Sequence, residues 1–383
     1  MEIYLNKRAV VFCVLLLVIL SLLYSTTFHA PFNFDDEVVI KFEVVQKGAH
    51  DWFGKLYPPK YRHLFYSSLI FNYSKGQLNP FGYHLVNTSL HFFTSIVIFF
   101  IAFITIKKGL SLNKKEALSI AGITTLLFSI NPVHSETVNY ISARAVGLSS
   151  FFYLSALLSF ILGSFRERKP LPRFLLYVST LICFLASILS KETALTFPIV
   201  LLLYDVCFMR NDYWAPLKNR LLFFYLPLFL CAILAVLKIL SFKDLIVDFW
   251  QRINVGYGLK QIQIIGHGAR LILLPIGLTF DYDFPNTFFA TNTLLITTFL
   301  FALGIILTIA LYFPKRLMLV SFCFFWFLIT LAPTNSIFPR ADLLSERNLY
   351  LPSFGILFLL AITIHRLVLA NHNQLVVKKI GAY

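Results

Sequence analysis

The segment Ala9–Thr27 (AVVFCVLLLVILSLLYSTT) decides the class of this protein, because it is almost entirely apolar and contains no charged residue. A helix of about 20 such residues crosses the roughly 30 Å hydrocarbon core of a bilayer. Lys7 and Arg8 precede the segment, as in a signal peptide. The run is too long for a typical signal sequence, however, and no small-residue cleavage site follows it. We therefore expect an uncleaved first transmembrane span.

The composition of the whole chain also indicates a membrane protein. Of its 383 residues, 58% are hydrophobic and only 13% are charged, whereas about a quarter are charged in soluble domains. The mean hydropathy is +0.76. The basic residues behind the net charge of +15 lie in short loops between apolar segments, so we expect no nucleic-acid partner. The five cysteines form no CxxC pair, which favours packing over disulfides or metal ligation.

Ten apolar segments predict an all-α polytopic membrane protein, a bundle of about 10–11 transmembrane helices. They cover residues 9–27, 86–106, 117–130, 145–162, 175–189, 194–207, 221–240, 291–313, 317–332 and 351–369. A further stretch, Ile262–Leu278, is interrupted by glycines, Arg270 and Pro275, and we expect a re-entrant or surface-lying helix there. We expect one transmembrane domain over residues 1–383.

The charges of the loops predict the orientation of the bundle. With the N-terminus in the cytoplasm, the cytoplasmic side carries 18 of the 33 Lys and Arg residues in short segments, but only five of the 18 acids. Positive residues favour the cytoplasmic side of a membrane. The long first loop, 28–85, and the segment 241–290 then lie on the non-cytoplasmic face.

Asn33-Phe34-Asp35-Asp36-Glu37 places three consecutive carboxylates a few residues after the first span. Burying a carboxylate in a bilayer is costly, so acidic clusters beside one often have a function or a partner. A water-exposed loop that helps to fix the topology is the alternative.

The short connectors expected on the same face each carry an acid and a base. Their charged or titratable residues are His134, Glu136, Arg144, Lys191, Glu192, Glu346 and Arg347. Two interpretations compete. Neighbours such as Lys191 and Glu192, or Glu346 and Arg347, form loop ion pairs that fix helix ends, or else the cations bind a lipid-linked phosphate while an acid takes a proton.

Metal and nucleotide motifs are weak or absent. His134 has no second histidine at ligand spacing, and His84 and His91 are seven residues apart, which does not suit a site on one helix. Asp281-Tyr282-Asp283 has the D-x-D form of nucleotide-sugar enzymes, but such a triplet is common by chance. The chain contains no P-loop, G-x-S-x-G or H-E-x-x-H motif.

Several segments, in the same order along the chain, resemble the TMTC-type transmembrane O-mannosyltransferases, which are part of the GT-C class of glycosyltransferases. They are Phe34-Asp35-Asp36, Tyr61-Arg62, Asn79–Asn87 (NPFGYHLVN), Asn131–Arg144, Ser190-Lys191-Glu192, Leu273-Leu274-Pro275 and Glu346–Ser353. Eukaryotic members continue into a tetratricopeptide array, whereas this sequence stops shortly after its last span. The short form favours a bacterial or archaeal plasma membrane.

The resemblance implies transfer of a sugar, mannose in the named family, from a polyprenyl-phosphate carrier to a hydroxyl of a protein or glycan acceptor. Inversion at the anomeric carbon, the non-cytoplasmic face, and no nucleotide, metal or other cofactor are expected. Asp35 is the expected general base, and Asp36 would orient the site or substitute for it. The expected donor-phosphate ligands are Arg62, Lys191 and Arg347, supported by Arg144 and Arg270. The expected supporting or sugar-binding residues are His84, His134, Glu136, Glu192, Asp281 and Glu346.

Two other functions remain open at this point. A transporter or flippase of lipid-linked sugars would need charges at mid-membrane and two matching halves, and the sequence shows charges mostly at span ends and no internal repeat. A non-catalytic membrane scaffold would need no acids and bases gathered on one face.

Overall fold

The computed structural model describes residues 7–41, 45–46, 62–209, 214, 220–226, 228–230, 233–234, 237, 255–284, 315–336, 339–340 and 342–380. The predicted span 291–313, part of the predicted span 221–240, and residues 241–254 and 285–290 lie outside these ranges. Within them the chain is helical, with one isolated antiparallel bridge between Phe165 and Trp214.

The helices follow the apolar segments of the sequence. The α-helices are α1 (Lys7–Leu23), α2 (Asp35–Lys41), α4 (His63–Gly76), α5 (Pro80–Ile104), α6 (Lys114–Ser129), α7 (Ser135–Asn139), α8 (Arg144–Gly163), α9 (Pro170–Ser190), α10 (Phe197–Phe208), α14 (Val255–Leu273), α17 (Lys315–Leu331) and α18 (Ser353–Ile380). Short 3-10 or π segments are η1 (Thr27–His29), η2 (Thr105–Gly109), η3 (Pro132–His134), η4 (Ile141–Ala143), η5 (Glu192–Thr196), η6 (Leu221–Tyr225) and η7 (Glu346–Leu349).

Several of these helices are long and apolar enough to cross a bilayer. In the described ranges they are Pro80–Gly109, Ile141–Gly163 and Pro170–Ser190, and a fourth if Lys114–Ser129 and Pro132–Asn139, bent by 52°, form one span. Shorter apolar helices lie at Val10–Leu23, Leu317–Leu331 and Ser353–Val368. The chain is an all-α polytopic membrane protein, as its hydropathy predicts.

The helix that carries the predicted span 86–106 begins six residues earlier than that span. The Asn79 side chain accepts a hydrogen bond from the backbone N–H of Phe81, and Pro80 occupies the first turn, so α5 begins at Pro80. A capping amide followed by proline is a strong helix start. His84 therefore lies inside α5 and is buried.

The segment Ile262–Leu278 is also more regular than expected. Helix α14 runs through Gly266 and Gly268 and ends at Leu273, before Pro275. A Cβ atom on Gly268 would lie 2.9 Å from Cδ2 of Leu349, so this glycine lets α14 pack closely against η7. The close contact sets the position of the connector that carries Arg347.

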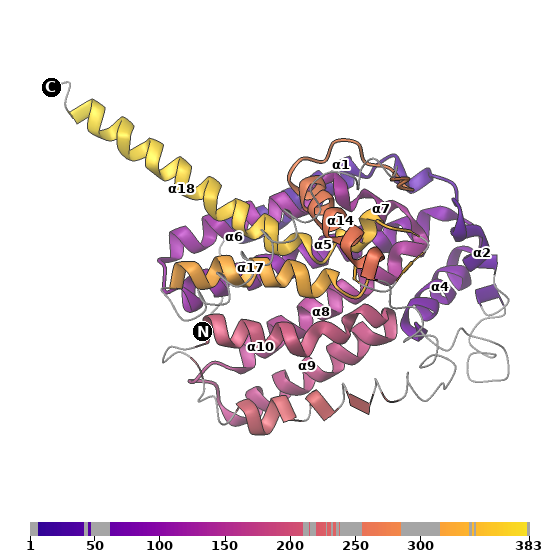
Figure 1. The fold of residues 1–383 in the computed structure, drawn as a ribbon, viewed down its shortest axis with the longest axis horizontal. Coiled ribbons are helices and arrows are strands. Elements are labelled where there is room, and N and C mark those ends of the chain that lie inside the picture. The colour runs from indigo at the N-terminus through magenta and orange to yellow at the C-terminus, as the bar shows by residue number, and fades with distance from the viewer. Residues whose placement is uncertain are drawn as a thin grey trace.

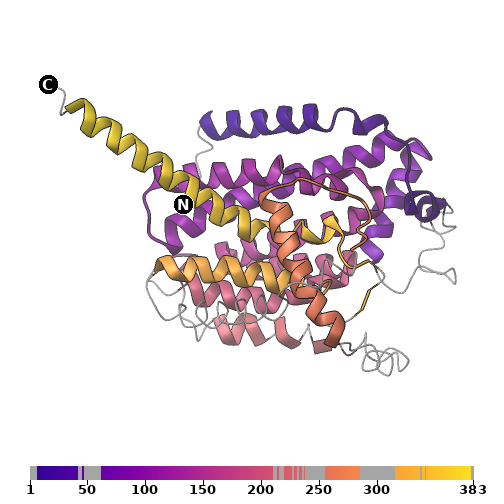
Figure 2. The same ribbon diagram turned by 45° about the horizontal axis from the view of Figure 1, so that its top comes forward.

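The spans run roughly along the long axis of the molecule (Figures 1 and 2). Helix α1 lies along one edge against α5, and α18 packs on α6, α17 and α14 before it projects beyond the bundle (Figure 2). Helix α7 packs on α5, α8 and η7, and α2 and α4 lie at the end opposite to the projecting part of α18 (Figure 1). We call this the loop end.

Candidate active site at the loop end

Asp36 is buried and joins α2 to η4. Its Oδ1 accepts hydrogen bonds from the backbone N–H and the hydroxyl of Ser142, both at 2.7 Å, and its Oδ2 accepts one from the N–H of Ile141 at 3.3 Å. Burial raises the pKa of Asp36, and these hydrogen bonds oppose the rise. Its carboxylate oxygens are thus occupied by protein groups, which indicates a structural role.

Asp35 is exposed on the other side of the same turn and lies near Tyr140. The pKa of Tyr140 is raised to about 12, first by burial and then by the neighbouring Asp35 carboxylate. A substrate can reach Asp35 but not Asp36. The structure therefore separates two carboxylates that the sequence leaves equivalent.

Phe34 holds the chain just before Asp35 in a strained conformation. Its φ is 50°, in the left-handed region, which costs a non-glycine residue about 1 kcal/mol or more. The ring of Phe34 stacks on that of Phe280, with centroids 4.2 Å apart and an interplanar angle of 7°. This contact ties the acidic turn to the segment that follows α14.

Glu136 and Arg347 form a partly buried ion pair between α7 and η7. The Nη1 of Arg347 donates to Oε1 of Glu136 at 2.8 Å, and the Arg347 backbone N–H donates to Oε2 at 2.7 Å. The guanidinium carbon lies 5.7 Å from the ring centroid of Tyr140. Charge-assisted bonds of this kind fix the cation in place. Arg347 retains an exposed side-chain fraction of 25%, which leaves room for a ligand.

Lys191 lies buried between η5 and η7, where its Nζ donates to Oδ1 of Asn348 at 3.0 Å. Burial, together with the positive charges of Arg62, Arg340 and Arg347, lowers the pKa of Lys191 to about 7, and Glu192 opposes this shift. Several cations therefore converge near one ammonium group. An anion bound there would relieve their repulsion.

Arg62 and Glu192 join the start of α4 to η5. Arg62 Nε donates to Oε2 of Glu192 at 3.1 Å, and Nη2 donates to Oε1 at 2.7 Å. Burial opposes both charges, but the pairing outweighs it. The pKa of Arg62 rises, and that of Glu192 falls to about 2. Arg62 has φ 67° and is, like Phe34, a strained residue beside the site.

Glu346 faces away from this cation group toward the segment after α14. Its Oε1 accepts hydrogen bonds from the N–H of Thr279 at 2.8 Å and the hydroxyl of Tyr282 at 2.6 Å. Burial raises the pKa of Glu346, against the opposing effect of these bonds. Asp281 is exposed on the same segment, and Arg270 donates to the carbonyl of Ile276 at 2.6 Å.

Glu136 and Glu192 thus pair with cations of other connectors, whereas Arg347 also contacts Asp342 of its own connector at 3.5 Å. The interpretation of Lys191–Glu192 and Glu346–Arg347 as ion pairs within one loop is wrong, because Glu192 binds Arg62 and Arg347 binds Glu136. Adjacent side chains on an extended or 3-10 backbone point in different directions. Each of these contacts therefore joins two separate elements.

Arg144, expected beside the donor phosphate, is fully buried below the site. It donates to Oδ1 of Asn87 at 2.7 Å, to Oδ1 of Asn72 at 2.6 Å and to the carbonyl of Tyr83 at 2.9 Å, and Nη1 also donates to Ser68. With its guanidinium enclosed by neutral acceptors, this placement supports a structural role. It gives no support to phosphate binding.

The predicted supporting histidines are buried, like Arg144, in a layer of side chains beneath the exposed site residues. His134 contacts the carbonyl of Phe128 at 2.7 Å and the hydroxyl of Ser353 at 2.9 Å, and His84 contacts the carbonyl of Ala30 at 3.1 Å. His91, which contacts the Tyr350 hydroxyl at 2.7 Å and the Ser129 carbonyl at 2.9 Å, joins the same layer. These rings link helix ends, and their placement does not support sugar contact.

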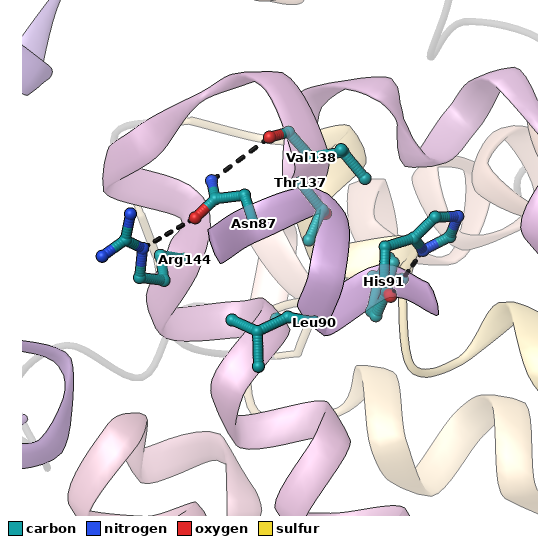
Figure 3. Close-up of a pocket in the computed structure, with 8 residues that line it drawn as sticks. Asn87, Leu90, His91, Thr137, Val138 and Arg144 are labelled. Carbon is teal, nitrogen blue, oxygen red and sulfur yellow. Dashed lines mark hydrogen bonds between the residues drawn. The ribbon is translucent and has the colours of Figure 1, made fainter. Parts of the chain in front are cut away.

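A narrow pocket lies within this layer (Figure 3). Its lining residues are Asn87, Leu90, His91, Thr137, Val138, Arg144, Gly147 and Tyr350. Asn87 receives a hydrogen bond from Arg144 and donates to the carbonyl of Val138 (Figure 3). The space is too small for a water molecule, so it is a packing gap and not a substrate cavity.

Sequence reasoning missed Tyr140 and Tyr282. Tyr140 stands between the motif residues Glu136 and Arg144, and Tyr282 is the middle residue of the D-x-D triplet. A search limited to charged residues does not find such tyrosines. In the described ranges no three His, Cys, Asp or Glu residues gather as a metal site, and metal independence stays a prediction.

Comparison with known proteins identifies the relatives of the chain. No protein-family model and no solved structure matches it. It is 26% identical to protein O-mannosyl-transferase TMTC3 of Mus musculus over 79% of this chain and 35% of that protein. It is 27% identical to protein O-mannosyl-transferase F38B6.6 of Caenorhabditis elegans over 92% of this chain and 51% of that protein. The resemblance to TMTC-type O-mannosyltransferases is confirmed.

The similarity is higher over a shorter part of the chain. Human protein O-mannosyl-transferase TMTC3 is 32% identical over 41% of this chain and 16% of its own length. The chain spans about half or less of the length of these TMTC-type relatives. These relatives are named as O-mannosyl-transferases, which supports a glycosyltransferase.

Proposed function

We propose that this chain transfers a sugar from a polyprenyl-phosphate carrier to an acceptor hydroxyl on the non-cytoplasmic face, with inversion at the anomeric carbon. Mannose and a protein acceptor are the first candidates, because the similar TMTC-type proteins are protein O-mannosyl-transferases. The observation that carries the proposal is the exposed carboxylate of Asp35, which has Tyr140 as a common neighbour with Arg347, one of the cations that converge on Lys191.

Asp35 is the proposed general base. The acceptor hydroxyl gives its proton to the Asp35 carboxylate as its oxygen attacks the anomeric carbon. The new carbon–oxygen bond forms while the bond from that carbon to the phosphate oxygen breaks. The polyprenyl phosphate leaves with one additional negative charge. Asp36 has a different role, because its bonds to Ser142 hold the turn that presents Asp35.

Lys191, Arg347 and Arg62 are the proposed donor-phosphate ligands. Lys191 comes first, because its contact is a neutral amide and a phosphate would supply the missing negative charge. Arg347 and Arg62 are held by carboxylates in fixed orientations. Cations fixed before the reaction stabilise the charge that develops on the leaving phosphate. Arg270 lies on α14 and Asp281 on the segment that follows it, and both keep only supporting roles.

The proposal is tested with purified full chain in liposomes, radiolabelled polyprenyl-phosphate mannose or glucose, and a mixed peptide and glycan acceptor fraction. Label that becomes resistant to lipid extraction supports transfer. Label that crosses the bilayer and stays extractable supports the transporter alternative and contradicts the proposal. Label that does neither contradicts both. Inversion is checked by the anomeric configuration of the product.

A further inference from the structure

Tyr140 lies near both Asp35, the proposed general base, and Arg347, a proposed ligand of the donor phosphate. The neighbouring Asp35 carboxylate acts on its hydroxyl. The Arg347 guanidinium carbon lies 5.7 Å from its ring centroid. Phe280 packs edge-on against the same ring, with centroids 5.1 Å apart and an interplanar angle of 84°. The ring therefore links the base side of the site to the phosphate side.

The backbone of Tyr140 is held in place on both sides. Its N–H donates to the carbonyl of Glu136 at 3.1 Å, and its carbonyl accepts from the N–H of Ala143 at 3.1 Å and from Nδ2 of Asn87 at 3.4 Å. The residue is only 6% exposed. Its side chain is thus positioned by the fold itself before any substrate binds.

The hydroxyl of Tyr140 is buried and makes no hydrogen bond of good geometry in the part of the chain that the structure describes, although the Asp35 carboxylate and the Ser142 side chain lie close enough to shift its pKa. An unpaired buried hydroxyl is destabilising, and such groups in a native protein call for an explanation. The pKa of Tyr140 is raised to about 12 by burial and by Asp35, so the hydroxyl keeps its proton at neutral pH. It is a proton donor that stands beside Asp35 without a well-formed hydrogen bond to it.

We propose that the Tyr140 hydroxyl donates a hydrogen bond to a hydroxyl of the sugar that is transferred. This inference rests on the proposed function. In an inverting displacement the attacking oxygen and the leaving oxygen lie on opposite faces of the sugar ring. A group between the base and the phosphate-binding cation therefore faces the sugar. Tyr140 selects among sugars, because a site built to bond a hydroxyl rejects analogues that lack it.

The test compares the wild type, Tyr140→Phe and a control, Tyr73→Phe, all as full chains in liposomes. Tyr140→Phe keeps the ring and its contacts with Arg347 and Phe280. Tyr73 is a partly buried tyrosine of α4 outside the site. Each protein is assayed with polyprenyl-phosphate mannose and glucose, with the monodeoxy analogues of the preferred sugar, and with bare polyprenyl phosphate as a competitor. Thermal midpoints in detergent check that each variant is folded.

We expect Tyr140→Phe to lower kcat/KM for the preferred donor about threefold to tenfold, the range for one neutral hydrogen bond. The wild type and Tyr140→Phe should transfer one monodeoxy donor equally well. This donor lacks the sugar hydroxyl that accepts the hydrogen bond from Tyr140. Inhibition by bare polyprenyl phosphate should stay within twofold, and Tyr73→Phe should match the wild type.

Three results would overturn the inference. They are transfer by Tyr140→Phe within twofold of the wild type, an equal loss with every deoxy donor, and an equal loss of affinity for bare polyprenyl phosphate. A wild type that transfers no sugar contradicts the proposed function instead. In that case the affinities for the sugar-loaded carrier and for the bare carrier are compared. If the ratio of these two affinities is the same in Tyr140→Phe as in the wild type, Tyr140 does not contact the sugar.

Discussion

The Asp36 carboxylate accepts hydrogen bonds from both the backbone N–H and the hydroxyl of Ser142, each at 2.7 Å, across 106 residues of sequence. Asp35, its neighbour, is exposed. One acid of the pair therefore anchors the turn, and the other is open to solvent. Substitutions at the two positions should have different effects.

Asp35→Asn should abolish sugar transfer and leave the protein stable. Loss of a general base typically lowers the rate by about 10²–10⁴-fold, and an exposed carboxylate contributes little to folding. Initial rates of transfer and the thermal midpoint in detergent measure the two effects. Glu37→Gln is the matched control, because Glu37 is an exposed acid on the same turn that pairs with Lys41. Wild-type transfer by Asp35→Asn would remove this residue as the base.

Asp36→Asn should instead destabilise the protein. An amide at this position can accept hydrogen bonds through only one oxygen, so its NH₂ group faces the donors of either Ser142 or Ile141. The expected loss is about 1–3 kcal/mol of unfolding free energy, seen as a lower thermal midpoint. Ser142→Ala should show a smaller loss in the same direction. A wild-type midpoint together with complete loss of transfer would point to direct catalysis by Asp36.

Binding of the donor should weaken as the pH rises through about 7. The pKa of Lys191 is lowered to about 7 by burial and by Arg62, Arg340 and Arg347, with Glu192 opposing. Below this pH the ammonium is charged and attracts the phosphate, and above it the amine is neutral. Since one proton is involved, the affinity should fall by at most about tenfold per pH unit.

The measurement for Lys191 is the affinity for a sugar-loaded carrier between pH 6 and 9, where its phosphodiester keeps a constant charge. Lys191→Arg should flatten the profile, because a guanidinium stays charged throughout this range. Lys75→Arg, at an exposed position of α4, is the control and should keep the wild-type slope. A steep profile that persists in Lys191→Arg would assign the titration to another group.

Arg347 and Glu136 should act as one unit. Arg347→Gln removes a phosphate ligand, and Glu136→Gln removes the charge that orients it at 2.8 Å. Each single variant should raise the KM for the donor about tenfold or more, and the double variant should be no worse than Arg347→Gln alone. Contacting residues are commonly non-additive in this way. Additive losses in KM would show that the two side chains act independently.

The helical segments followed from the sequence because membrane spans depend on local hydrophobicity. Apolar runs at 145–162 and 175–189 match α8 and α9 closely. The start of α5 was placed six residues late, because hydropathy does not detect a cap such as Asn79-Pro80. The buried role of Arg144 was also missed, since its acceptors lie 57 to 76 residues away.

The chemistry available to this protein, and its position near a membrane, can be inferred from the chain alone. Long apolar runs must cross a bilayer, and acids and bases at their ends stay near its surface. Which of these groups act together depends on contacts between distant segments, such as Arg62 with Glu192 and Glu136 with Arg347. Burial likewise distinguishes Asp35 from Asp36, which are equivalent in sequence. Desolvation and hydrogen bonding arise only when η4 packs on α2, so tertiary structure assigns the two carboxylates their different roles.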